Sequence, residues 1–137
     1  MPQYDYLKNQ IDEIGRFLAQ LVADFLKMKK GGEQIEAVAM VENSLKENLD
    51  LSLDNLIQLS AEETIALLKS DSTASFIYLD HLAKILFHIG SVEKDTQKAR
   101  KFMQQAQQFY RYLLDKDPIY SFERHQQIEK IEMILKG

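Results

Sequence analysis

The chain has 137 residues, 45% hydrophobic and 28% charged, with only five glycines and two prolines, which predicts one globular domain over residues 1–137 rather than a disordered chain. The absence of cysteine excludes a disulfide scaffold, a thiolate nucleophile, an iron–sulfur cluster and cysteine-ligated zinc. The net charge of −4, the short apolar runs and the missing signal peptide lead us to expect a cytoplasmic protein that binds neither nucleic acid nor membrane.

An apolar stripe with helical spacing marks residues 3–30 as the first predicted helix. Three lysines lie in its last turn, and Gly31 and Gly32 end it. The stripe predicts either packing along the same domain or a homodimeric coiled coil through residues 4–28. Gly15, beside the stripe, either permits close helix approach or weakens the helix by ~1 kcal/mol. The stripe consists of Tyr4, Leu7, Ile11, Ile14, Leu18, Leu21, Phe25 and Met28.

The middle of the chain predicts a helical hairpin followed by short helices. Residues 33–48 form a second helix that folds back on the first, because the Gly-Gly connection is short. A short helix is expected over residues 53–59. Ser60 and Glu63 form a capping-box pattern, which predicts that another helix begins there and continues to Leu68. The apolar row of the second helix is Ile35, Val38, Val41, Leu45 and Leu49.

The C-terminal half predicts three longer helices. The first follows polar N-cap candidates at residues 71–75 and runs to about Ile89; it is the most apolar helix, so we expect it at the centre, with Gly90 as its C-terminal cap. The second covers residues 93–116 and ends before Pro118. The last begins near Ser121 and turns inward Phe122, Ile128, Ile131, Ile134 and Leu135.

The predicted fold is therefore all-α, a bundle of about six helices. Its N-terminal part is a helical hairpin with short helices over residues 1–70, and its C-terminal part is a three-helix unit over residues 71–137. Such helices are marginal alone in water, so their stability must come from packing.

Residues 76–135 resemble a tetratricopeptide-like arrangement, with one helix ending at Gly90, small residues at Ala99 and Ala106, and Pro118 before a closing helix. The spacing from Ala99 to Pro118 exceeds the family spacing, so the resemblance implies one enlarged repeat plus a closing helix. The whole chain also resembles an uncharacterised family of short helical bacterial proteins, a domain of unknown function. That resemblance rests on Asp5-Tyr6-Leu7, on Ile11, Ile14, Gly15 and Leu18, and on the leucine-rich stretch 49–68; it implies the fold but no activity.

The common catalytic patterns are missing. The three histidines, His81, His88 and His125, have no spacing typical of a metal site, and no nucleophile elbow, phosphate loop or dinucleotide fingerprint occurs. Glu62 and Glu63 are explained by helix capping and the helix dipole. We therefore predict no catalytic residue, no cofactor, no metal and no enzyme. A small-molecule pocket near Tyr78, His81 and Arg111 remains an alternative.

One helical face stands out for its charge. Between residues 96 and 114 there are four basic residues and no acidic one. The pattern predicts either a docking face for an anionic or polar protein partner or a solvated outer face. We expect a non-catalytic protein–protein interaction module, with a homo-oligomer joined through the first helix or a small-molecule-binding bundle as alternatives. The predicted docking residues are Lys94, Lys98, Lys101, Gln105, Gln108, Arg111 and Tyr112.

Overall fold

The computed structural model describes the backbone of residues 2–68 and 72–137 and the side chains of residues 13–68 and 74–137. Every regular element in these residues is a helix, so the all-α prediction is confirmed, with seven helices where about six were expected. The predicted cap residue Asp71 lies outside the described residues. The helices are α1 (Pro2–Lys30), α2 (Gln34–Leu49), α3 (Leu53–Leu56), α4 (Ala61–Leu68), α5 (Ser72–Val92), α6 (Thr96–Lys116) and α7 (Phe122–Lys136).

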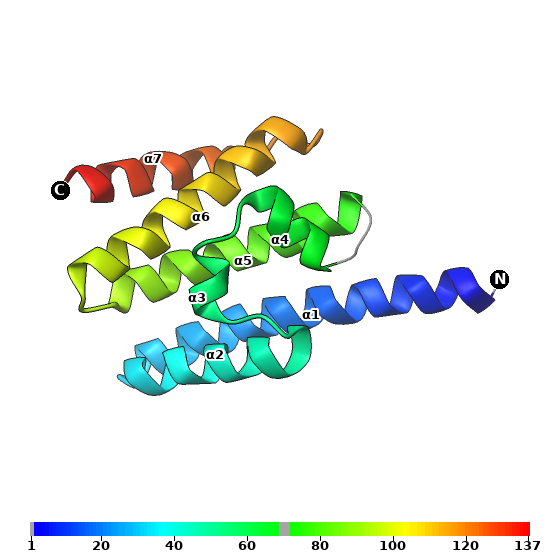
Figure 1. Cartoon of the computed structure of the whole chain (residues 1–137), viewed down its shortest axis with the longest axis horizontal. Coiled ribbons are helices and arrows are strands. Elements are labelled where there is room, and N and C mark those ends of the chain that lie inside the picture. The colour runs from blue at the N-terminus through cyan, green and yellow to red at the C-terminus, as the bar shows by residue number, and fades with distance from the viewer. Residues whose placement is uncertain (1, 69–71) are drawn as a thin grey trace.

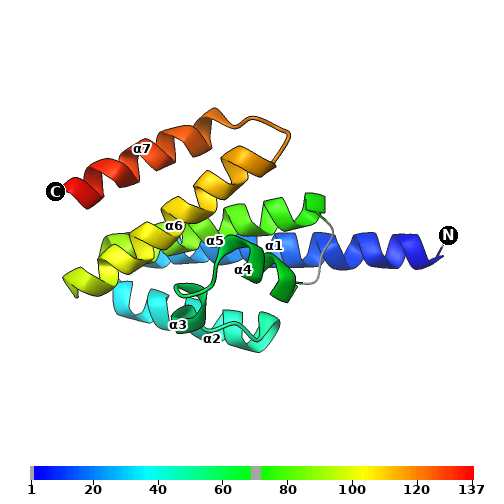
Figure 2. The same ribbon diagram turned by 45° about the horizontal axis from the view of Figure 1, so that its top comes forward.

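Helix α5 occupies the centre of the bundle, as its apolar character predicted. It packs against α1, α4 and α6, while α2 packs on α1 and α7 packs on α6. The predicted N-terminal hairpin of α1 and α2 is therefore present. Figures 1 and 2 show the long helices in the order α2, α1, α5, α6, α7, with α4 in front of α5 and α3 between α4 and α2. The first turns of α1 extend beyond the neighbouring helices in both views.

One apolar core joins all seven helices. It receives Leu18 from α1, Val41 from α2, Leu56 from α3 and Ala61 from α4. Helices α5 and α6 supply the most buried apolar residues, whereas Ile131 is the single buried apolar residue of α7. Burial of this kind yields roughly 25 cal/mol for each Å² of apolar surface, so packing rather than helix propensity holds the short helices α3 and α4 in place.

Local signals set most helix ends, as predicted. The Glu63 amide donates to the Ser60 hydroxyl and the Ser60 amide donates to the Glu63 carboxylate, each at 3.0 Å, which completes the capping box. The hydrogen bond from the Ser60 backbone, and then that from its hydroxyl, lower the pKa of Glu63. Gly32 has a φ of +83°, in the region that glycine tolerates best, and ends α1. Asp95 and Ser121 cap α6 and α7.

Gly90 does not end its helix, so its predicted role as a C-terminal cap is wrong. Helix α5 continues to Val92, and Gly90 is buried where α6 crosses it. A Cβ atom at Gly90 would lie 3.1 Å from the Cβ of Phe102 and 3.4 Å from the carbonyl oxygen of Ala99. The missing side chain therefore permits close approach of α5 and α6.

Several residues predicted to face the core are exposed instead. Helices α2 and α7 each rest mainly on one neighbour, so their buried stripes are narrower than the apolar patterns that mark them. In α1, the described half of the stripe packs within the chain, since Leu18, Leu21 and Phe25 are buried; the side chains of Tyr4, Leu7 and Ile11 lie outside the described residues. Among the residues of the predicted apolar rows, the exposed ones are Ile35 (78% exposed), Phe122 and Ile134; other exposed apolar residues of the helices include Leu26, Leu67 and Ile77.

Candidate functional site

Helices α3 and α4 cross the predicted docking face and divide it. Gln105 is buried, and its side-chain amide donates to the carbonyl oxygens of Leu56, at 2.8 Å, and of Leu59. Tyr112 is half-buried against the core. The prediction that Gln105 lies on an open face is therefore wrong, because helical spacing does not reveal which amide will meet the backbone of a distant segment.

The remaining members of the face point in different directions. Arg111 lies between α6 and α7, where its Nη2 is 3.2 Å from the Glu132 carboxylate. Gln108 is exposed on α6, one turn after the buried Gln105. The exposed basic residues that stay together lie before the crossing, at the α5–α6 turn and the first turns of α6: Lys94, Lys98 and Lys101.

Replacing Gln105 by leucine is expected to destabilise the protein by about 2 kcal/mol, because two backbone carbonyls lose their donor inside the bundle. Urea unfolding measures this loss. The matched change Gln108→Leu, at an exposed amide of the same helix, is expected to stay within about 0.5 kcal/mol of the wild type. Equal effects of the two substitutions would contradict the structural role of Gln105.

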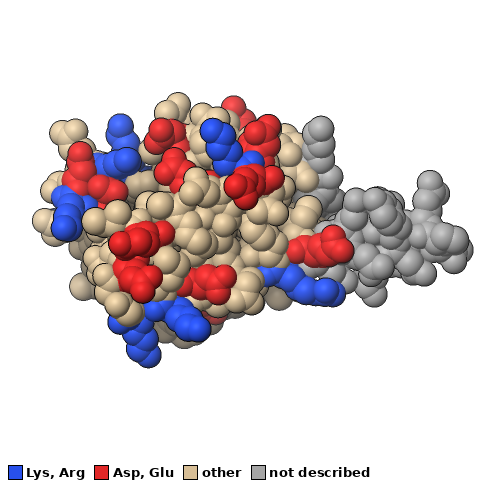
Figure 3. Space-filling model, turned by 90° about the horizontal axis from the view of Figure 1, so that it is seen from below, with Lys and Arg blue, Asp and Glu red and all other residues tan. Residues whose placement is uncertain are grey.

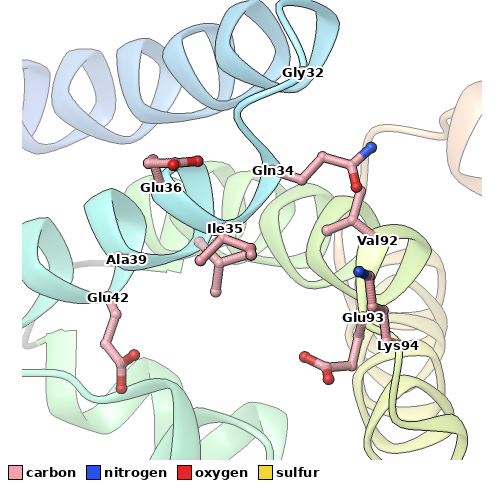
Figure 4. A pocket seen from close by; sticks show the side chains of 10 residues that line it. Gly32, Gln34, Ile35, Glu36, Ala39, Glu42, Val92, Glu93 and Lys94 are labelled. Atoms are coloured by element: carbon pink, nitrogen blue, oxygen red, sulfur yellow. The ribbon is translucent and has the colours of Figure 1, made fainter.

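A groove lies between α2 and the end of α5. It has a volume of about 550 Å³, and its apolar surface comes from Ile35, Val38, Ala39 and Val92. Figure 4 shows the Ile35 side chain in the middle of the opening. The predicted docking residue Lys94 lines the same groove, so part of the predicted face adjoins a concave apolar surface that the sequence does not reveal.

Carboxylates surround this groove. Figure 4 shows Glu36 and Glu42 on α2, and Glu93 reaching toward the opening from the end of α5. Among the described residues, none of the three forms an ion pair. They belong to an acidic part of the chain, since residues 33–63 hold eight acidic residues and one basic residue. Seen from below, the molecule shows both acidic and basic side chains around a broad area without charge (Figure 3).

The histidines do not form a metal site. His81 and His88 lie on α5, His125 lies on α7 with its Nε2 3.1 Å from the Glu129 carboxylate, and no metal-holding group of acidic and histidine side chains occurs in the described part of the chain. His88 contacts the rings of Phe25 and Phe87, at centroid distances of 6.4 and 5.4 Å. Burial, and then the positive charges of Lys29, Lys130 and Lys84, lower its pKa to about 4.

Acidification is expected to destabilise the protein through His88. Its pKa falls from about 6.5 in the unfolded chain to about 4 in the folded one, so between these values the unfolded state binds more protons. Stability is therefore full above pH 6.5 and declines as the pH falls toward 4, by about 1–2 kcal/mol for a half-exposed ring. Urea unfolding at several pH values measures the decline. His88→Gln should flatten it, and an unchanged slope would contradict this origin.

The residues of the alternative small-molecule pocket lie apart from the groove. Tyr78 is buried, with its ring edge 3.8 Å from where a Cβ on Gly15 of α1 would lie. His81 is half-buried on α5, and burial followed by the charge of Lys84 lowers its pKa. Arg111 pairs with α7 at the outer edge of the bundle. None of the three lines the groove.

Comparison with known proteins identifies no relative. No family model matches the chain, and no curated protein or solved structure shows significant similarity to it. The resemblances to a tetratricopeptide-like arrangement and to a family of short helical bacterial proteins therefore stay predictions. Only the all-helical fold that they implied is confirmed. Within the described part of the chain, no helix combines the length and the apolar character that crossing a bilayer requires.

Proposed function

We propose that the protein is a non-catalytic protein–protein interaction module of the cytoplasm, and that the groove between α2 and the end of α5 receives its partner. The observation that carries this proposal is Ile35, which is 78% exposed and lines the groove. A large apolar side chain at the edge of a groove gains contact area when a partner covers it, and buried apolar anchors contribute much of the binding energy in protein interfaces.

The tetratricopeptide-like helix order supports the same proposal by analogy. Helices α5, α6 and α7 follow one another as a helix, an antiparallel partner and a closing helix. Fold analogy does not identify a function, so the groove and its residues carry the argument.

Affinity capture from a lysate of the source cells tests the proposal. The tagged wild type is compared with Ile35→Ser and with the matched control Met133→Ser, which changes a 76% exposed apolar residue on α7. We expect Ile35→Ser to lose a protein that the wild type and Met133→Ser both retain, while all three keep the same melting temperature. Identical captures by all three proteins would reject the groove as the binding site.

Self-association through α1 is a second candidate. The first turns of α1 extend beyond the neighbouring helices (Figures 1 and 2), although Leu18, Leu21 and Phe25 are already buried within the chain. A dimer would therefore use the part of the stripe that precedes Ile14. Light scattering across a concentration series tests this candidate, and a mass equal to one chain at every concentration would reject it.

A further inference from the structure

The groove between α2 and the end of α5 has a chemistry that selects its partner. We propose that it binds a basic amphipathic segment of another protein, with apolar side chains on Ile35, Val38 and Val92 and with Lys or Arg side chains facing the surrounding carboxylates. This inference rests on the proposed function and specifies its partner.

The groove exposes apolar surface that a partner can cover. Ile35 and Ala39 are exposed, and the half-buried Val38 links this side of α2 to the core. Val92 adds apolar surface from the last turn of α5. A volume of about 550 Å³ accommodates a few large side chains rather than a whole domain face, so the expected occupant is a short segment.

Negative charge exceeds positive charge in the lining of the groove. Glu36, Glu42 and Glu93 contribute three carboxylates to the lining, against the single ammonium group of Lys94. Glu93 already accepts a hydrogen bond from the Asp95 amide at 3.2 Å, but its charge has no basic partner among the described residues. Glu36 and Glu42 are exposed on α2. A cationic segment would meet all three carboxylates, whereas an anionic segment would be repelled.

The sequence prediction of an anionic partner and this inference concern different surfaces. Lys98 and Lys101 do not line the groove. An anionic partner of those lysines would bind beside the groove, on the outer side of α6. Charge reversal therefore separates the two: Lys98→Glu is expected to leave binding in the groove unchanged or slightly stronger.

The test uses three labelled helical peptides of equal length and fluorescence anisotropy with the full chain. The first has a leucine row flanked by lysines, the second has the same row flanked by glutamates, and the third keeps the lysines but replaces the leucines by serines. We expect the first peptide to bind about ten-fold more tightly than either of the others at low salt. The difference between the first and second peptides should shrink as ionic strength rises.

Variants of the protein locate the site. The double change Glu36→Gln and Glu42→Gln is expected to weaken the first peptide about five-fold, and Ile35→Ser by a similar factor. The matched control Glu47→Gln removes an exposed carboxylate of α2 that does not line the groove, and it should change nothing.

Each other outcome overturns the inference. Equal affinity for the lysine- and glutamate-flanked peptides, or binding that the double variant leaves unchanged, shows that charge does not select the partner. The proposed function still stands in that case if Ile35→Ser loses a captured protein. Concentration-dependent self-association that the double variant abolishes would identify a second copy of this chain as the occupant instead.

Discussion

Replacing Gly90 by leucine is expected to destabilise the protein by about 3 kcal/mol. The first added atom alone would lie 3.1 Å from the Cβ of Phe102 and 3.3 Å from the Cε of Met103, which is closer than ordinary packing allows. The remaining leucine atoms must then push α6 away from α5, and these two helices share the most extensive interface of the bundle. Urea unfolding of both proteins measures the loss.

Gly15 provides the matched control for Gly90, because both are helical glycines beside another helix. A Cβ at Gly15 would lie 3.8 Å from the Tyr78 ring, an ordinary van der Waals distance. Gly15→Ala is therefore expected to stabilise the protein by up to about 1 kcal/mol through helix propensity. The sequence predicted that Gly15 either permits close helix approach or weakens the helix. The structure favours the second interpretation, because a side chain would fit at this position. A stable Gly90→Leu protein would contradict the close approach of α5 and α6.

Replacing Arg124 by methionine is expected to cost about 3 kcal/mol, because the largely buried Asp117 loses its cation and Asp80 keeps only its ion pair with Lys84. Its Nε lies 2.9 Å from Asp80 of α5, and its Nη1 lies 2.8 Å from Asp117, just after α6. The side chains of Arg124 and Asp117 are 12% and 11% exposed. The arginine thus joins three helices at one end of the bundle, and thermal unfolding measures its contribution.

An exposed ion pair gives the comparison for Arg124. Arg111 contacts Glu132 with both side chains about half exposed, so Arg111→Met is expected to cost under about 1 kcal/mol.

The pH dependence of stability also distinguishes the Arg124 site from the exposed Arg111 pair. Burial would raise the pKa of Asp117, but hydrogen bonds from Arg124 and the Ile119 amide outweigh it and lower that pKa. This stabilisation is present above the pKa of the unfolded aspartate and is lost as the pH falls through the lowered value. Arg124→Met should show a smaller acid loss, because only the Ile119 amide still lowers the pKa of Asp117. Equal costs for the two arginine variants would contradict the buried role of Arg124.

Local patterns in the sequence predicted the helices well. The capping box at Ser60, the glycine pair after Lys30 and the apolar run of α5 each act within a few residues, so each can be recognised without knowing the neighbours. Gly90 shows the limit of such reasoning, since glycine suits a helix end and a helix crossing equally well. Which role applies depends on Phe102 of the next helix.

The candidate site was only partly predictable for the same reason. Lys94, predicted as a docking residue from its charge and spacing, lines the groove, and its part in binding a partner stays a prediction. Gln105 was misplaced because its acceptors, the carbonyls of Leu56 and Leu59, lie in a distant segment. Ile35 was assigned to the core because its spacing fits an apolar row, and its exposure follows from how few neighbours α2 has. A groove made by two remote segments leaves no periodic signal in either of them.

The packing of α1 on α5 has a consequence for how fast the protein folds. This contact encloses α2, α3 and α4 in a chain loop between Lys30 and Ser72, whereas the α1–α2, α5–α6 and α6–α7 pairs join helices that follow one another directly. Closing a longer loop costs more chain entropy before its contacts are gained, and non-local contacts slow folding for that reason. The three sequential helix pairs can form by rapid local steps, so we expect the docking of α1 on α5 to set the refolding rate of the whole chain.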